Sequence, residues 1–360
     1  LTEALRRLAP ETGHLGLEKV IVRLANHTSD APGSVPQMIE LLAGNPTGSR
    51  IEWSIRTPHD RKLEPATTYA QRVASARARG LTYPYEVVRL FTAPPEGASS
   101  AVGAPTGSGS FQEYDLAGDR AEPVTRPPGL NRAGVVFGVI STPTRKHPEG
   151  MRRVLIASDA TRDMGALTAA ECDRIVAALD LAERERLPVE WVAVSAGARI
   201  AMDSGTENLD ATARVVRRLV TFTDAGFEVN LVLPGLTVGA QSYFDALATM
   251  ELRSRGILIM LANASMVLTG RAALEFSGGV AAEDEIGIGG YERIMGPNGE
   301  AQHQARDLAD AYSILLEHYA CSYVAPGESA PRRLETHDPI DRDVSLSPYE
   351  GDEGFSSIGE

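Results

Sequence analysis

The chain has 360 residues, of which 43% are hydrophobic, and this is enough to bury a core without disulfides or metal ions. Its net charge of −13 opposes phosphate backbones, so the composition argues against a nucleic-acid binder. No apolar run reaches the roughly 18 to 20 residues of a membrane span. Cys172 and Cys321 stand away from other metal-ligating residues. We therefore expect reduced core thiols, no metal site and a cytoplasmic protein.

The N-terminal part, residues 1–130, is predicted to be a small α/β extension. Its expected elements are strands at 17–24 and 49–56 and helices at 36–42 and 68–79. Residues 93–110 are rich in Ala, Gly, Pro and Ser, which predicts a mobile loop before the main domain. Because the sequence starts at Leu1 and ends in a polar, acidic stretch, we expect a piece of a longer polypeptide.

The main domain, residues 131–330, repeats an apolar strand, a glycine-bearing turn and a helix three times. The expected strands are 135–140, 154–158, 189–195, 229–233 and 257–261, and the expected helices include 209–223, 270–276 and 302–319. Thr168 and Glu171 form a T-x-x-E capping box at the start of another helix. These cycles predict an α/β fold, but their period does not distinguish a doubly wound sheet from a ββα spiral. Residues 331–360 are predicted to form a polar tail.

Two small-residue turns follow successive strands and are candidate sites for backbone chemistry. The first contains Ser195, Ala196 and Gly197, and the second contains Gly239 and Ala240. Small residues let backbone N–H groups approach a ligand closely, and two such groups aimed at a thioester oxygen would stabilise an enolate. The alternative is that both are tight turns whose small residues serve packing, and spacing alone favours this alternative for the first turn.

A longer ordered pattern resembles a known family. Residues 154–167, 177–188 and 195–200 follow the order strand, S-D-x-T turn, glycine, helix, proline and S-A-G-A-R-I. This order is similar to the carboxyltransferase component of acetyl-CoA and propionyl-CoA carboxylases. Residues 68–86, 234–243, 267–270 and 335–342 resemble further segments of the single-chain, eukaryotic-type enzymes. The resemblance implies the crotonase-like (ClpP/crotonase) ββα spiral of their N-terminal lobe, and 331–360 would lead to a second lobe.

The resemblance also implies a reaction, in which a carboxyl group moves from carboxybiotin to the α-carbon of an acyl-CoA. Ala196 and Gly197, together with Gly239 and Ala240, would donate backbone N–H groups to the thioester oxygen. The base in this family is the ureido nitrogen of biotin, so no protein base is required. Biotin is carried on a separate domain. The implied partners are the biotin carboxyl carrier and biotin carboxylase domains, the second carboxyltransferase lobe of another protomer, and further copies in a homo-oligomer.

Other polar residues are candidates for binding substrate. Ser195 and Arg199 belong to the first turn, and Arg199 is expected to order it. Arg145, Lys146 and Arg152 form a basic cluster that could contact CoA phosphates, although a solvated charged face explains them equally well. Ser195 lacks the G-x-S-x-G context of a hydrolase nucleophile.

Two rival functions stay open. One is another crotonase-like acyl-CoA enzyme, a hydratase or a decarboxylase; a hydratase needs two carboxylates, for which Asp203 and Glu207 are the best candidates. The other is a non-catalytic scaffold lobe of a carboxylase.

Overall fold

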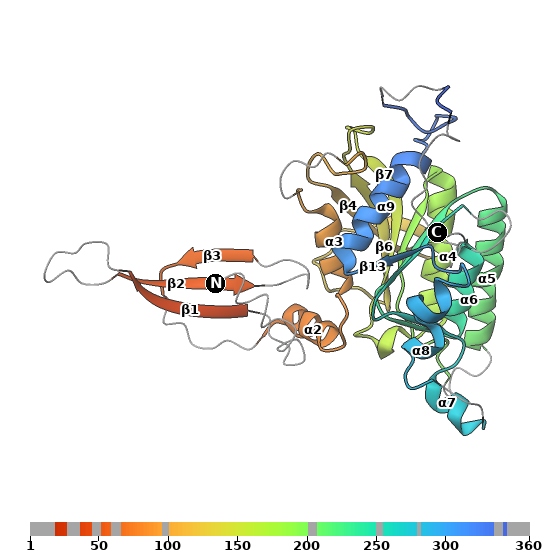
Figure 1. Ribbon diagram of the computed structural model, residues 1–360, viewed down its shortest axis with the longest axis horizontal. Helices are drawn as coiled ribbons and strands as arrows, with labels where there is room; N and C mark the ends of the chain where they lie inside the picture. Colours follow the sequence, from red (N-terminus) through yellow and green to blue (C-terminus); the bar gives the residue numbers. More distant parts are fainter. Residues whose placement is uncertain are drawn as a thin grey trace, which may run out of the picture. The chain divides into compact units, whose positions relative to one another are not determined.

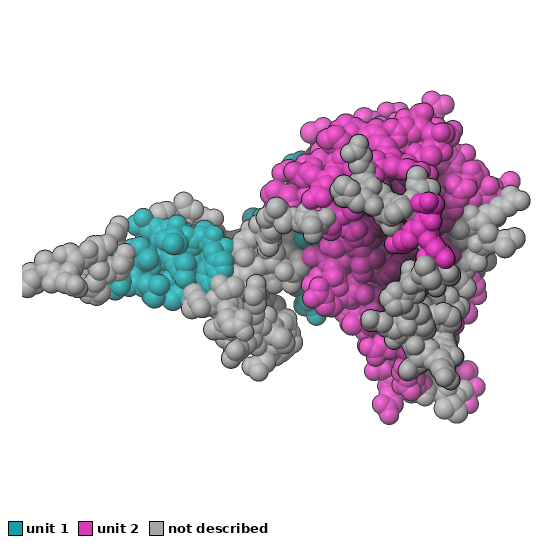
Figure 2. Space-filling view, turned by 45° about the horizontal axis from the view of Figure 1, so that its top comes forward, with its two compact units in different colours: residues 1–90, 127–130 teal, residues 91–126, 131–360 magenta. Residues whose placement is uncertain are grey.

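The structure is a computed structural model (Figure 1). It describes residues 19–26, 37–44, 52–58, 66–95, 101–200, 207–249, 255–278, 282–334 and 341–343. The chain divides into two compact units, residues 1–90 with 127–130 and residues 91–126 with 131–360 (Figure 2).

The first unit contains a three-stranded antiparallel sheet in the order β1-β2-β3. Its elements are β1 (Lys19–Asn26), β2 (Gln37–Gly44), β3 (Glu52–Arg56), α2 (Thr68–Arg77) and most of α3 (Pro84–Thr92), whose last two residues belong to the second unit. The helix predicted at 36–42 is wrong, because this short apolar run lies in β2, which pairs along its length with β1 and from Glu40 onward with β3. Glu40 of β2 is buried between Arg23 and Arg56, whose Nε atoms each lie 2.9 Å from its carboxylate.

The second unit is built on an eight-stranded sheet in the order β13-β11-β9-β8-β7-β6-β4-β5. The strands are β4 (Ser110–Ala117), β5 (Arg120–Pro123), β6 (Val135–Thr142), β7 (Met151–Ser158), β8 (Val189–Val192), β9 (Val229–Leu233), β11 (Leu258–Leu261) and β13 (His303–Ala305). Strands β7, β8, β9, β11 and β13 are parallel. Every residue of β8, β9 and β11 is buried, as expected for parallel strands that are covered on both faces.

The boundary predicted near residue 130 differs from the observed one. Residues 110–123 were assigned to the N-terminal extension, but they form β4 and β5, and β4 pairs antiparallel with β6 in the main sheet. The described part of the loop predicted at 93–110 is tied to this unit by a bridge between Pro105 and Thr144. Tertiary pairing, which no local pattern signals, therefore moves the boundary toward the N-terminus.

Helices cover both faces of the main sheet. They are α4 (Ala169–Glu185), α5 (Glu207–Asp224), α6 (Ala240–Thr249), α7 (Arg271–Phe276), α8 (Ile286–Gly289) and α9 (Leu308–Ser322), with the short turns η2 (Asp163–Gly165) and η3 (Tyr291–Met295). Helices α4, α5 and α6 lie side by side on one face (Figure 1). Trp191 of β8 stacks on Phe244 of α6, whereas Glu190 points to the opposite face, where α9 packs. The predicted capping box at Thr168 and Glu171 is confirmed, Cys172 is buried, and Cys321 is exposed rather than in the core.

A second, smaller sheet completes the fold. It pairs β10 (Leu236–Val238) in parallel with β12 (Ser265–Val267), and isolated bridges from Ser195 to Thr237 and from Leu167 to Ala198 extend it. Each cycle therefore adds one strand to the main sheet, one short segment to the second sheet and then a helix. The architecture is the ββα spiral that the resemblance implies, and the fold class is confirmed.

A buried ion pair joins the main sheet to α9. Arg153 and Glu190 are both fully buried, with Nε and Oε1 2.6 Å apart. Arg153 also donates to the hydroxyls of Thr142 and Tyr312, each at 3.0 Å. These bonds compensate for removing two charges from water, so loss of one charge would leave the other buried and unpaired.

We predict that Glu190→Leu lowers the free energy of unfolding by about 3 to 5 kcal/mol, because Arg153 loses its counter-charge. Arg153→Met combined with Glu190→Leu should recover most of that loss. Urea unfolding measures both. The control is Asp173→Ala, which removes the exposed Arg214–Asp173 pair and should cost less than about 1 kcal/mol. A double variant as unstable as Glu190→Leu would contradict the prediction.

Candidate active site

The second sheet places the two predicted turns next to each other. The Ser195 N–H donates to Leu236 O at 3.2 Å, and the Ser195 carbonyl oxygen accepts from Val238 N at 3.0 Å. Gly197 has a φ of +90°, and a Cβ added there would lie 3.1 Å from Val238 O. Because Gly239 and Ala240 directly follow β10, the turn at 195–199 and the turn at 239–240 are neighbours in space.

Three of the four predicted backbone donors already have acceptors within the protein. The N–H of Ala196 donates to Met164 O at 3.1 Å, and the N–H of Gly197 donates to Ser195 Oγ at 3.0 Å. The N–H of Gly239 donates to Val267 O at 2.9 Å. Ala240 differs because it begins α6, where an N–H has no acceptor within the helix. Among the described residues, no acceptor is recorded for it.

Ala198 supplies a second N–H without a recorded acceptor in the described part of the chain. Its neighbours bond to Leu167: Gly197 O accepts from Leu167 N at 2.8 Å, and Arg199 N donates to Leu167 O at 2.9 Å. Gly197 O and the Ala198 N–H belong to one trans peptide group, so they point in opposite directions. The Ala198 N–H therefore points away from Leu167, toward the side on which β10 lies. Ala198 was not predicted from the sequence, because its direction is set by the bonds that Leu167 makes to the residues on either side of it.

Ser195 and Arg199 make contacts that order the turn, and their binding of substrate stays a prediction. Ser195 is 1% exposed, and its Oγ accepts the Gly197 N–H. Arg199 lies 3.7 Å from Asp163 in an ion pair whose partners are 47% and 69% exposed. The ordering role expected for Arg199 agrees with this contact.

The predicted basic cluster lies at the other edge of the sheet. Arg152 is at the start of β7 and pairs with Glu185 at 3.7 Å, while Lys146 donates to Ala320 O and Arg145 is exposed in the preceding hairpin. Ala157 of β7 is the residue opposite the end of β8. Arg152 precedes it by five residues, which is roughly 17 Å of strand. The structure does not bring these side chains to the turns, and their contact with CoA stays a prediction.

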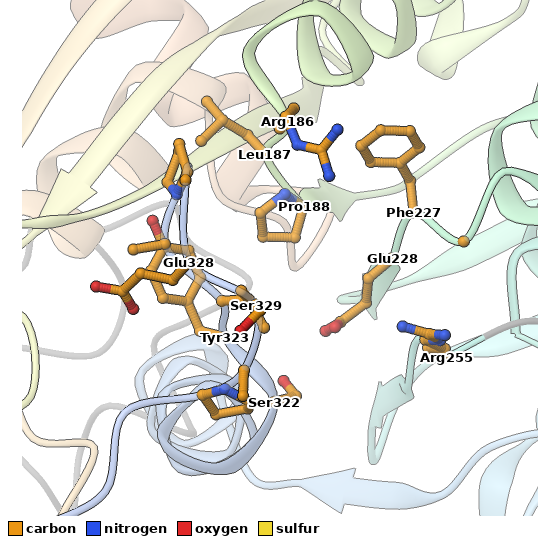
Figure 3. Close-up of a pocket in the computed structure, with 17 residues that line it drawn as sticks. Arg186, Leu187, Pro188, Phe227, Glu228, Arg255, Ser322, Tyr323, Glu328 and Ser329 are labelled. Carbon is orange, nitrogen blue, oxygen red and sulfur yellow. The ribbon is translucent and has the colours of Figure 1, made fainter.

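A pocket of about 590 Å³ opens at the same distant edge (Figure 3). Arg186 and Phe227 lie on one side of it, and Tyr323 lies on the other. Residues 187–188 and 226–228 come just before β8 and β9, so the pocket lies where these parallel strands begin. The two turns lie where the strands end, and this pocket is therefore separate from them.

A buried carboxyl group lies on α6, one helical turn beyond the second small-residue turn. Asp245 is 0% exposed, and its Oδ1 accepts from Gln241 Nε2 at 2.9 Å. Burial, with a smaller contribution from the charge of Glu300, raises the pKa of Asp245 to about 7. Burial also raises the pKa of Glu300. Near neutral pH, α6 thus carries a carboxyl group that tends to keep its proton.

In the described ranges, no cluster of His, Cys, Asp and Glu is suited to hold a metal ion. No helix there is long and apolar enough to cross a membrane. Asp203, the side chain of Glu207 and residues 335–340 lie outside the described residues, so the carboxylates suggested for a hydratase have no described position.

The carboxyl transferase domain family matches residues 108–356. The chain is 29% identical to the propionyl-CoA carboxylase beta chain of Rhodococcus erythropolis over 163 residues, which are 45% of this chain and 32% of that protein. It is 33% identical to acetyl-CoA carboxylase 2 of Arabidopsis thaliana over 78 residues, 22% of this chain and 3% of that protein. The chain thus spans about a third or less of these relatives.

Two solved structures share the fold at low sequence identity. Transcarboxylase 12S, determined with methylmalonyl-coenzyme A and methylmalonic acid bound, has a TM-score of 0.57 at 20% identity, covering 74% of this chain and 47% of its own. The beta subunit of geranyl-CoA carboxylase from P. aeruginosa has a TM-score of 0.50 at 19% identity, covering 69% of this chain and 41% of its own.

We predict that protonated Asp245 makes stability depend on pH. Its pKa is about 7 in the folded chain and about 4 when unfolded, so the folded state binds more protons between these values. Stability from this group is therefore present below about pH 4 and is lost as the pH rises to 7. Asp245→Asn should remove roughly 2 to 3 kcal/mol of the difference in unfolding free energy between pH 5 and pH 8.

Urea unfolding at both pH values measures this difference. Glu300→Gln serves as the comparison, because the raised pKa of Glu300 contributes with the same sign. Equal pH dependence in the unsubstituted chain and in Asp245→Asn would contradict the prediction.

Proposed function

Because the chain belongs to the carboxyl transferase domain family, we propose that it binds an acyl-CoA and activates its α-carbon to accept a carboxyl group. The observation that carries the proposal is the pair of N–H groups of Ala198 and Ala240, which have no recorded acceptor among the described residues and belong to adjacent turns. A thioester oxygen placed between them would accept both hydrogen bonds. The negative charge that develops on this oxygen as the α-proton leaves would then be stabilised in place.

The position of Ala240 supports this assignment. It begins α6, a helix of 10 residues, and the N-terminus of a helix favours a nearby negative charge. Ala198 contributes the other donor from the turn at 195–199, which is bonded to Leu167 on one side and to β10 on the other. Neither donor needs a titratable side chain. In this proposal Ala196, Gly197 and Gly239 shape the turns, because their own N–H groups are engaged.

Carboxybiotin would supply the carboxyl group, and a second lobe would make most of the contacts with the biotin. The enzyme would then be a biotin-dependent carboxylase in which biotin travels on a carrier domain charged by a biotin carboxylase domain. The relatives named as propionyl-CoA and acetyl-CoA carboxylases support an acyl-CoA acceptor. The hexamer assembly described for transcarboxylase 12S supports a homo-oligomer. A cytoplasmic location belongs to the same proposal.

The proposed function is tested by the reverse half-reaction. The natural holoenzyme is given malonyl-CoA or methylmalonyl-CoA, and decarboxylation is followed with and without free biotin. We expect turnover that depends on biotin. Decarboxylation without biotin would favour a crotonase-like decarboxylase, and absence of turnover with either acyl-CoA would favour a scaffold lobe.

We predict that Gly197→Val lowers kcat for this half-reaction by about 10²- to 10³-fold, the usual cost of losing one oxyanion donor. The added side chain meets Val238 O, which lies 3.1 Å from the Cβ position, and so displaces the Ala198 peptide. The matched control is Gly226→Val, because Gly226 has a similar φ of +86° with nothing within 4 Å and lies far from the turns. Equal turnover in both variants would argue against the assignment.

A further inference from the structure

Three consecutive residues before α4 have left-handed backbone conformations. The φ angles are +46° at Asp163, +56° at Met164 and +72° at Gly165. Residues other than glycine seldom adopt this region, and methionine lacks the short polar side chain that helps Asp and Asn to do so. Such strain persists only where the surrounding structure enforces it, and it is concentrated at functional sites.

The surrounding structure holds this turn from both ends. On the N-terminal side, buried Asp159 donates its N–H to Gly134 O at 2.7 Å and accepts from Thr161 N at 3.0 Å. On the C-terminal side, Glu171 accepts the Gly134 N–H at 2.8 Å while it caps α4. Both flanks are thus anchored to the same residue, Gly134. The left-handed turn lies on the connection between these two anchored flanks.

The left-handed turn at 163–165 is joined to the candidate turn at 195–199 by a backbone hydrogen bond. Met164 O accepts the N–H of Ala196 at 3.1 Å. A Cβ at Gly165 would lie 2.5 Å from Val194 O, so the two segments meet at backbone contact. An exposed ion pair between Asp163 and Arg199, at 3.7 Å, adds a weak second link.

We propose that Met164 is a positioning residue, whose left-handed backbone fixes the Ala196 peptide and thereby aims the Ala198 N–H at the acyl-CoA thioester. The backbone conformation matters here rather than the side chain, which is 48% exposed. The identity of the ligand rests on the proposed function, whereas the ordering of the turn does not.

The test separates backbone from side chain with four variants of the holoenzyme. Met164→Val keeps an apolar side chain, but its branched Cβ strongly disfavours a positive φ. Met164→Ala removes the thioether and leaves the φ preference close to that of methionine, whereas Met164→Asn and Met164→Gly tolerate the left-handed conformation better. In biotin-dependent malonyl-CoA decarboxylation, we expect Met164→Val to lower kcat at least tenfold with little change in KM. Met164→Ala, Met164→Asn and Met164→Gly should stay within about twofold of the unsubstituted enzyme. A loss of kcat in Met164→Asn and Met164→Gly equal to that in Met164→Val would overturn the proposal.

A second measurement does not require activity. Hydrogen exchange of peptides covering residues 193–200 is compared with that of β9 as an internal reference. We expect Met164→Val to accelerate exchange at 193–200 about tenfold, and Met164→Ala and Met164→Asn to leave it unchanged. If exchange changes in this way but the unsubstituted holoenzyme transfers no carboxyl group, the proposed function is contradicted and the role of Met164 is not. Unchanged exchange in Met164→Val would overturn the role of Met164.

Discussion

The candidate site depends on one short ladder of backbone hydrogen bonds. It runs from Leu167 to Ala198, from Ser195 to Thr237, and on to β12. The main sheet by itself fixes only the positions at which its parallel strands end. The second sheet holds the peptides beyond those ends in register, so that each N–H has a defined direction. A backbone donor is useful in catalysis only when its direction is fixed before the substrate arrives.

The described residues of the two turns offer backbone groups rather than a reactive side chain. Ser195 is buried, and its Oγ accepts the Gly197 N–H within the turn. What the two turns offer is a pair of N–H groups, at Ala198 and at the start of α6. Such a pair suits a reaction whose main requirement is to stabilise an enolate oxygen while the proton acceptor and the carboxyl group come from another component. The proposed carboxyl transfer has this requirement.

Much of the fold could be predicted from local signals. The capping box at Thr168 and Glu171, the apolar runs of β9 and β11, and the two glycine turns each express a requirement that is local in sequence. The run at 36–42 was misassigned because a short apolar segment fits either a helix or a strand, and its pairing with β1 and β3 decides the outcome. Residues 110–123, which form β4 and β5, were assigned to the N-terminal extension for a similar reason, since β6, the partner of β4, lies beyond the predicted boundary.

The site was predicted only in part, for two physical reasons. Small residues identified two turns that the structure brings together, but the N–H that stays available depends on Met164 and Leu167, which approach from another segment. The basic cluster at 145–152 was close to the first strands in sequence, but the length of β7 carries it to the far edge of the sheet. Sequence therefore locates the turns, and tertiary partners decide which peptide groups can serve a ligand.

The most direct test of this account is a crystal structure of the natural holoenzyme with an acyl-CoA bound. The account predicts that the thioester oxygen lies about 2.7 to 3.1 Å from the backbone nitrogens of both Ala198 and Ala240. A thioester oxygen that is bound by Ala196 and Gly197 instead, or that lies away from both turns, would contradict it.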